Sequence, residues 1–90
     1  MKIEIKKFGT YLISRPEGRD AALVIRNQIL TPANARSVEL DFNEVKVLTP
    51  SWLDEVLQEI FKTIPPTDVQ FLNTSNASVK ASLEMVLSIK

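Results

Sequence analysis

One segment of the chain places a hydroxyl at the start of a helix, with an aromatic side chain and two acidic side chains directly after it. Ser51 and Trp52 are followed by Asp54 and Glu55. A hydroxyl in the first turn of a helix can cap backbone N–H groups, or it can carry a phosphate that the helix dipole attracts. A tryptophan there can cover the edge of the core or anchor a protein partner. The segment therefore predicts a helix cap, a regulated hydroxyl or a docking surface.

Two residues compete for the position of the cap. In one alternative Ser51 caps the helix through a Ser-x-x-Asp box with Asp54, and in the other Thr49 is the cap and Pro50 is the first helical residue. Either arrangement explains the segment without any chemistry. A phosphate on Ser51 would meet attraction from the helix dipole and repulsion from Asp54 and Glu55, each of order 1 kcal/mol. Phosphorylation is therefore expected to act on a partner's surface more than on the fold.

The acidic side chains of this helix form a weak catalytic pattern. Asp54 and Glu55 are neighbours, so they point about 100° apart and cannot act on one substrate atom. Glu55 and Glu59 lie one helical turn apart with like charge. The pattern indicates a solvated face or an acidic stripe that docks a basic patch on a partner.

The composition excludes most catalytic and metal-binding constellations. The chain contains no His and no Cys, which removes thiolate zinc sites and the usual proton shuttle of neutral pH. It has no glycine-rich phosphate loop, and Asp41 with Asp54 lacks the third ligand that a magnesium site needs. We expect no enzyme, no cofactor and no metal. Nucleotide binding remains an alternative, because the start of a helix attracts anions.

Length and charge predict one small domain that does not bind nucleic acid. The 90 residues are 44% hydrophobic and 24% charged, and a chain this short normally builds a single core, here spanning residues 1–90. The net charge is zero, without the strongly basic face that nucleic acid requires. No stretch is long and apolar enough for a signal peptide or a membrane span. We therefore expect a cytoplasmic protein that binds neither nucleic acid nor membrane.

The elements around the Ser51 segment follow from hydrophobic spacing and caps. Residues 2–14 predict a two-stranded hairpin with a turn near Phe8 and Gly9, and Ser14 with Glu17 forms a capping box for a helix that ends at Thr31 and Pro32. Residues 38–42 predict a central strand that continues over residues 45–48. Helical spacing, the strongest in the chain, covers residues 53–64. A strand over residues 69–72 and a last helix from Asn76 or Ser78 complete the chain.

This order, β-β-α-β-α-β-α, predicts an α/β fold. Strands that alternate with helices indicate parallel pairing, and the hairpin would add an antiparallel pair. We therefore expect a mixed four-stranded sheet with an N-terminal hairpin and with helices packed unevenly on it.

Residues 38–57 resemble the strand-turn-helix signature of STAS domains, the fold of bacterial anti-sigma factor antagonists. In those proteins Asp-Ser-Ser-Gly-Leu leads into a helix and the second Ser is the phosphoacceptor, a position that Ser51 occupies here. The Asp and the first Ser are replaced by Thr49 and Pro50, and the Gly is replaced by Trp52.

The chain is still more similar to the STAS-like domains of unknown function. That similarity lies in Asp41-Phe42, in Val45, in Ser51-Trp52-Leu53-Asp54-Glu55 and in Ser14-Arg15 before the first helix.

The resemblance implies a non-catalytic regulatory module of bacterial signalling that binds a protein. Its partner would be a GHKL-type kinase or an anti-sigma factor, with a second copy of the chain as a further candidate. The expected docking residues are Val47, Thr49, Ser51, Trp52, Asp54 and Glu55. The alternatives are a structural or auxiliary interaction domain without a phosphoswitch and a nucleotide-binding module.

Overall fold

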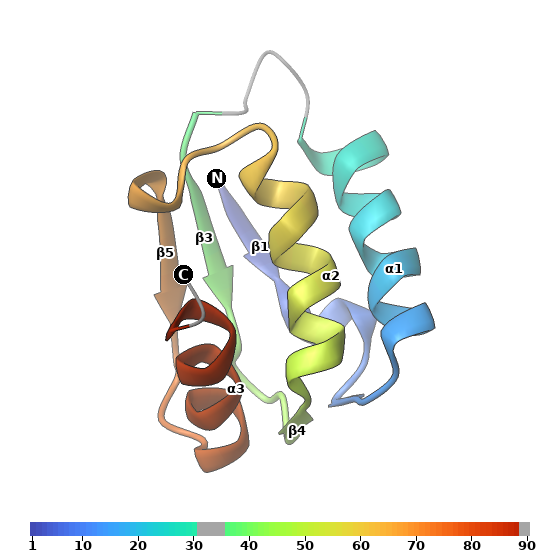
Figure 1. Ribbon diagram of the computed structural model, residues 1–90, viewed down its shortest axis with the longest axis vertical. Coiled ribbons are helices and arrows are strands. Elements are labelled where there is room, and N and C mark those ends of the chain that lie inside the picture. Colours follow the sequence, from blue (N-terminus) through green and yellow to red (C-terminus); the bar gives the residue numbers. More distant parts are fainter. Residues whose placement is uncertain (31–35, 89–90) are drawn as a thin grey trace.

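Three parallel strands form the sheet on which the helices pack (Figure 1). The computed structural model describes residues 1–30 and 36–88. The strands β1 (Lys2–Glu4), β3 (Val38–Asp41) and β5 (Val69–Leu72) lie in the order β1-β3-β5, and both neighbouring pairs are parallel. The prediction that the strand beginning at Val38 is central is confirmed, as is the α/β class.

The predicted N-terminal hairpin and the mixed four-stranded sheet are wrong. The strand β2 (Tyr11–Leu12) pairs in parallel with β4 (Val47–Leu48), in a separate two-stranded sheet. Between β1 and β2 the chain forms a short 3-10 helix, η1 (Ile5–Phe8), and then Gly9 adopts a φ of 129°. These turns lead β2 away from β1, because they lack the tight two-residue geometry that closes a hairpin.

Local caps begin each of the three α-helices. The Ser14 hydroxyl oxygen accepts a hydrogen bond from the Glu17 N–H at 3.3 Å at the start of α1 (Arg15–Val24), as predicted. A π-helix, η2 (Ile25–Ile29), continues α1, and the predicted end of this helix at Thr31 and Pro32 lies outside the described residues. The helix α2 (Pro50–Phe61) follows β4.

The last part of the chain also follows the prediction. A 3-10 turn, η3 (Pro66–Asp68), leads into β5, and α3 (Ala77–Ser88) begins after Asn76. The Asn76 side-chain oxygen accepts hydrogen bonds from the N–H groups of Ser78 and Val79 at 2.7 and 3.2 Å, so Asn76 is the cap. Across residues 1–30 and 36–88, no helix is long and apolar enough to cross a membrane.

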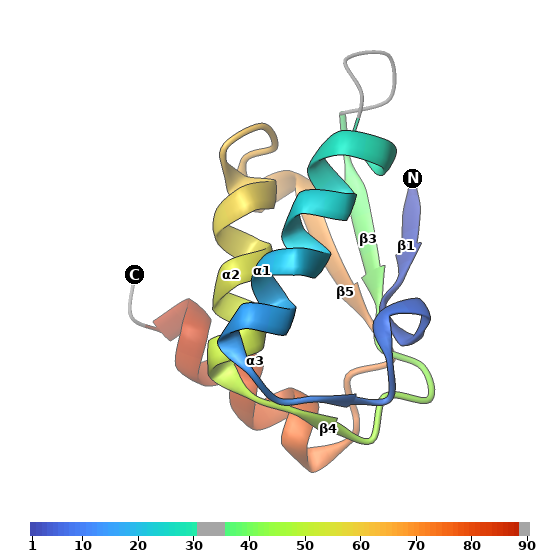
Figure 2. The same cartoon turned by 90° about the vertical axis from the view of Figure 1, so that its right-hand side faces the viewer.

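The helices α1 and α2 lie side by side over one face of the sheet, and α3 packs against α2 and β4 (Figure 2). The opposite face carries no helix from the described part of the chain (Figure 2). A cross-strand row on that face is polar and consists of Lys2, Glu39 and Gln70. Polar side chains on one face of a sheet are typical of a face that water covers, which explains the uneven placement of the helices.

The core lies between the sheet and the helices. In α2 the buried stripe is Leu53, Val56, Leu57 and Ile60, each at most 1% exposed, which confirms the predicted helical spacing over this range. The helix ends at Phe61, so its predicted continuation to residue 64 is wrong, although Ile64 is also buried. From the sheet, Ile3 and Leu40 point into the same core.

The helices α1 and α2 approach each other most closely at Gly18. A Cβ atom on Gly18 would lie 2.6 Å from the carbonyl oxygen of Trp52 and 2.8 Å from its Cα. Both distances are far below van der Waals contact, and both atoms belong to backbone. The position therefore requires glycine, and the contact holds the first turn of α1 against the first turn of α2.

Candidate functional site

The predicted docking segment lies at the end of the sheet to which the parallel strands point (Figure 1). There β4 passes into α2, and Thr49 is the cap of that helix. The Thr49 Oγ1 accepts a hydrogen bond from the Trp52 N–H at 3.4 Å and donates to the Ile13 carbonyl oxygen at 2.6 Å. Of the two caps left open above, Thr49 followed by Pro50 is confirmed, and the cap at Ser51 is wrong.

Ser51 occupies the second position of α2 and is partly exposed. Thr49 is the better cap because its hydroxyl also bonds the end of β2, a contact between residues 36 positions apart. Within residues 1–30 and 36–88, no protein group forms a hydrogen bond with the Ser51 hydroxyl. The fold therefore leaves this hydroxyl available.

Trp52 is a core residue. Its side chain is 1% exposed, and its indole lies 6.3 Å from the Phe8 ring, centroid to centroid. The interpretation of Trp52 as a cover for the core is confirmed. Its predicted role as a residue that contacts a partner directly stays a prediction, and the small exposed fraction of the side chain does not support it.

Asp54 and Glu55 converge on one arginine. The Arg15 Nη1 donates to Asp54 Oδ2 at 3.2 Å and to Glu55 Oε2 at 2.6 Å, and Arg19 lies 3.9 Å from Glu55. These hydrogen bonds, chiefly the one that Arg15 donates to Glu55, raise the pKa of Arg15. The predicted acidic stripe thus forms ion pairs within the chain, because helix α1 supplies the basic side chains that were expected from a partner.

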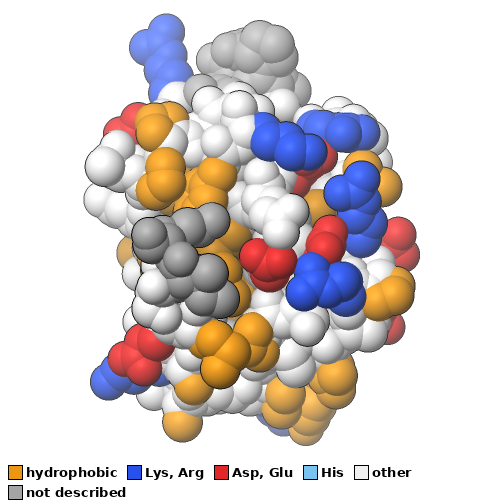
Figure 3. Space-filling model, in the orientation of Figure 1, with side chains coloured by type: hydrophobic (Ala, Val, Ile, Leu, Met, Phe, Trp, Pro, Cys, Tyr) orange, Lys and Arg blue, Asp and Glu red, His pale blue; other side chains and the backbone are white. Residues whose placement is uncertain are grey.

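Glu59, the third member of the stripe, is nearly buried at 3% exposure. Its carboxylate lies 3.0 Å from the Lys62 Nζ and 3.1 Å from the Arg26 Nη1. Lys62, and more weakly Arg26, hold the pKa of Glu59 below its usual value. Figure 3 shows the resulting mixture of basic and acidic side chains over the helices. Each acidic side chain of the stripe on α2 therefore has a basic partner within the chain, and α2 offers no acidic stripe to another protein.

Exposed apolar side chains lie beside the Ser51 turn. Tyr11 and Ile13, at the end of β2, are 58% and 54% exposed, and Tyr11 pairs with the half-buried Val47 of β4. Thr49 joins Ile13 to the turn that carries Ser51. We call Tyr11, Ile13, Val47 and Ser51 the β2–α2 surface.

Tyr11, Ile13 and Arg15 were not among the site residues predicted from the sequence. A signal was present, because Tyr11 and Ile13 alternate with the buried Leu12 and must therefore point outward from a strand. No local sequence pattern, however, predicts that β2 pairs with β4.

Asp41 lies at the end of β3 and is held by polar neighbours. Its Oδ1 accepts hydrogen bonds from the Asn73 amide at 2.7 Å and from the Asn43 N–H at 2.9 Å, and Lys2 lies at 3.3 Å. These donors, the Asn73 amide first, hold the pKa of Asp41 below its usual value. The group joins Lys2, at the start of β1, to the carboxyl ends of β3 and β5. In the described ranges no three metal-ligating residues gather in one place.

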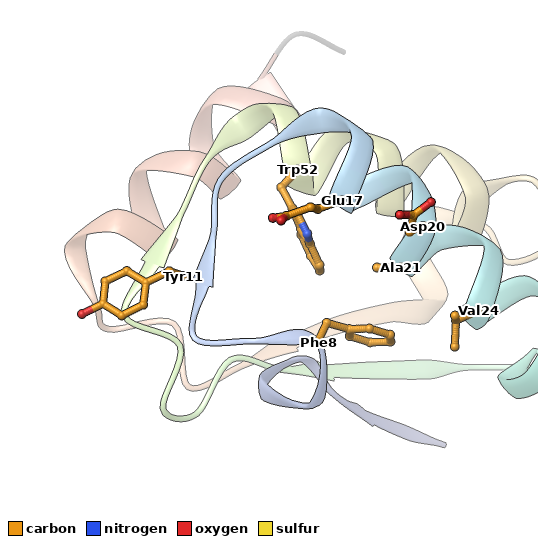
Figure 4. Close-up of a pocket in the computed structure, with 7 residues that line it drawn as sticks. All are labelled: Phe8, Tyr11, Glu17, Asp20, Ala21, Val24 and Trp52. Atoms are coloured by element: carbon orange, nitrogen blue, oxygen red, sulfur yellow. The ribbon is translucent and has the colours of Figure 1, made fainter.

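A hollow of about 360 Å³ opens next to the β2–α2 surface, between η1, β2 and α1 (Figure 4). It shares Tyr11 with that surface, and Trp52 forms part of its wall. The residues that line it are Phe8, Tyr11, Glu17, Asp20, Ala21, Val24 and Trp52.

A protein-family model matches the chain. The model of a family described as "STAS-like domain of unknown function (DUF4325)" matches residues 21–79, which is more than half of the chain. The matched range contains β3, β4, α2 and β5, and so includes the Ser51 segment. Neither the curated proteins nor the solved structures contain a match to the chain.

Proposed function

Since the chain belongs to the family of STAS-like domains of unknown function, we propose that it is a non-catalytic regulatory module that binds a protein through the β2–α2 surface. The observation that carries the proposal is the pair of exposed apolar side chains, Tyr11 and Ile13, beside a serine hydroxyl that forms no hydrogen bond with the described part of the chain. Exposed aromatic and aliphatic side chains at the centre of a surface are typical of protein interfaces. The partner would be a GHKL-type kinase or an anti-sigma factor, as the resemblance to anti-sigma factor antagonists implies.

The position of Ser51 suggests how phosphorylation would change this surface. Asp54 and Glu55 follow Ser51 by three and four residues, so all three side chains share one face of α2. Both carboxylates bind Arg15. A phosphate of about −1.5 to −2 charges on Ser51 would compete with them for the guanidinium. We propose that the modification redirects Arg15 and thereby alters the surface that the partner meets.

The nucleotide-binding alternative receives less support at this place. An anion at a helix start needs free N–H groups. Here Pro50 has no N–H, and the Trp52 N–H already donates to Thr49. A structural or auxiliary domain without a phosphoswitch is the alternative that the first experiment below separates from a docking module.

The docking proposal predicts that Ile13→Glu abolishes partner binding. The change places a charge in the middle of the exposed apolar pair, where a bound partner would exclude water. The measurement is capture of partners from the native cell by the immobilised chain, with identification by mass spectrometry. Met85→Glu is the matched control, because Met85 is 55% exposed but belongs to α3. A partner that is recovered equally by wild type and Ile13→Glu would remove the β2–α2 surface from consideration.

The phosphoswitch predicts separate effects of Ser51 on binding and on stability. Because Thr49 is the cap, Ser51→Ala and Ser51→Asp are expected to change the free energy of unfolding by no more than about 0.5 kcal/mol. Ser51→Asp should change the affinity for the captured partner at least about tenfold, equivalent to 1.4 kcal/mol, while Ser51→Ala keeps it. Thr49→Ala is the control and should lose about 0.5 to 2 kcal/mol of stability. Normal binding by Ser51→Asp, with no phosphate on the native protein by intact mass, would contradict the switch.

A further inference from the structure

The hollow beside the β2–α2 surface has aromatic and apolar walls. Phe8 is half-buried and Trp52 stands next to it, while Ala21 and Val24 form the side contributed by α1 (Figure 4). Tyr11 lies at the rim and its hydroxyl points outward (Figure 4). The volume of about 360 Å³ is enough for a long side chain.

Two carboxylates border this hollow. Glu17 and Asp20 are exposed on α1, three residues apart, and among the described residues neither has a basic side chain within ion-pair distance. The acidic side chains of α2 differ in this respect, because each has a basic partner. The basic side chains of the same part of α1, Arg15 and Arg19, turn toward Glu55 on α2 instead. The border of the hollow therefore carries uncompensated negative charge.

We propose that this hollow accepts the basic side chain of an arginine or lysine presented by a protein partner. The partly exposed Phe8 ring and the two carboxylates all attract cations, and they lie around one opening, whereas Trp52 is 1% exposed and adds little surface to it. The aliphatic stem of the basic residue would lie against Ala21 and Val24, with its charged end near Glu17 and Asp20. Arginine is favoured over lysine, because its planar guanidinium can stack on a ring and bind a carboxylate at the same time.

The identity of the occupant as part of a protein rests on the proposed function. Tyr11 belongs to both the hollow and the β2–α2 surface, so a partner docked on that surface would reach the hollow with a neighbouring residue. The preference for a cation rests only on the walls and border of the hollow. The two parts of the proposal can therefore be tested separately.

The test of the cation preference uses the isolated chain and a blocked amino acid. Trp52 is the one tryptophan of the chain, so its indole N–H resonance and its fluorescence report directly on the wall of the hollow. N-acetyl-arginine amide is expected to shift the indole resonance with a dissociation constant on the order of 1 mM. N-acetyl-norleucine amide, which is apolar and uncharged, should bind at least about fivefold more weakly, because the wall rings and the border carboxylates attract charge.

The matched variants distinguish the effect of the two border carboxylates on binding from the effect of net charge. Glu17→Gln with Asp20→Asn should weaken binding of the arginine amide at least about fivefold, because the local attraction is lost. Asp68→Asn with Glu84→Gln changes the net charge equally at exposed positions outside the hollow, and should leave binding within about twofold of wild type. Equal shifts by both amides, equal binding by the Glu17 and Asp20 variant, or no shift with the arginine amide would each overturn the cation site.

The occupant is tested with the captured partner. The Glu17→Gln, Asp20→Asn variant should bind that partner at least about fivefold more weakly, and the Asp68→Asn, Glu84→Gln variant should bind it as wild type does. Unchanged partner binding by a variant that has lost the arginine amide would show that the partner does not fill the hollow, and would overturn that part alone. Failure of the proposed function would appear elsewhere, as unchanged capture by Ile13→Glu.

Discussion

Trp52→Ala is expected to lower the free energy of unfolding by about 3 to 5 kcal/mol, the usual cost of removing a buried aromatic side chain. Trp52 is 1% exposed, packs near Phe8 and lies under the close contact of α1 with α2. A domain of this size has a total stability of roughly 5 to 13 kcal/mol, so the loss is a large part of it. Denaturant unfolding followed by circular dichroism measures the change without a tryptophan signal.

Tyr11→Ala is the control for this experiment. Tyr11 is an aromatic residue of the same region but is 58% exposed, so its removal should cost no more than about 0.5 kcal/mol. If Trp52→Ala is too unstable to purify, Trp52→Phe provides a milder change that should still lower the midpoint of unfolding. Equal stability of Trp52→Ala and wild type would mean that the indole is not part of the core. Because the residue supports the fold, loss of partner binding by a Trp52 variant would not identify a docking residue.

Gly18→Ala is expected to destabilise the protein by about 1 to 3 kcal/mol, although alanine is the better helix former by about 1 kcal/mol. The added methyl group would lie 2.6 Å from the Trp52 carbonyl oxygen, and backbone cannot move aside without separating α1 from α2. The measurement is the free energy of unfolding in urea. The separation would also widen the base of the hollow, so the indole resonance of Trp52 should move.

Ala81→Gly makes the reverse change at an exposed position of α3 and serves as the control. Helix propensity alone should cost it about 1 kcal/mol. The expected result is thus that both exchanges destabilise, in spite of their opposite directions. A more stable Gly18→Ala variant would show that the helices do not meet at this residue.

The prediction that differs most from the structure is that of the docking surface. The sequence predicted the hydroxyl of Ser51 as a candidate switch, and the structure adds that no group of residues 1–30 and 36–88 forms a hydrogen bond with it. The acidic residues Asp54 and Glu55 were expected to bind a basic partner, but in the structure both accept hydrogen bonds from Arg15 of the same chain. The apolar part of the surface, Tyr11 and Ile13, was read only as part of a hairpin strand.

Local interactions were what the sequence determined by itself. The cap at Ser14, the start of the last helix at Asn76 or Ser78, the buried stripe of α2 and the strand over residues 69–72 all depend on neighbours within a few positions. The family resemblance rested mainly on one continuous segment, residues 38–57, with Ser14-Arg15 as a further point of similarity, and the family is confirmed over residues 21–79. Caps and helical spacing involve residues at most one or two turns apart, so they can be predicted from the sequence alone.

Pairings between distant residues were decided only by the tertiary structure. β1 pairs with β3 and β2 with β4, each across more than 30 residues, because a 3-10 turn and Gly9 separate β1 from β2. Thr49 became the cap because its hydroxyl also reaches the carbonyl of Ile13. The hollow exists because η1 and β2 are held beside α1. Parallel strands are not joined by a tight turn, so no local sequence pattern marks their pairing. Such contacts between distant residues stabilise the protein only once the whole sheet has formed.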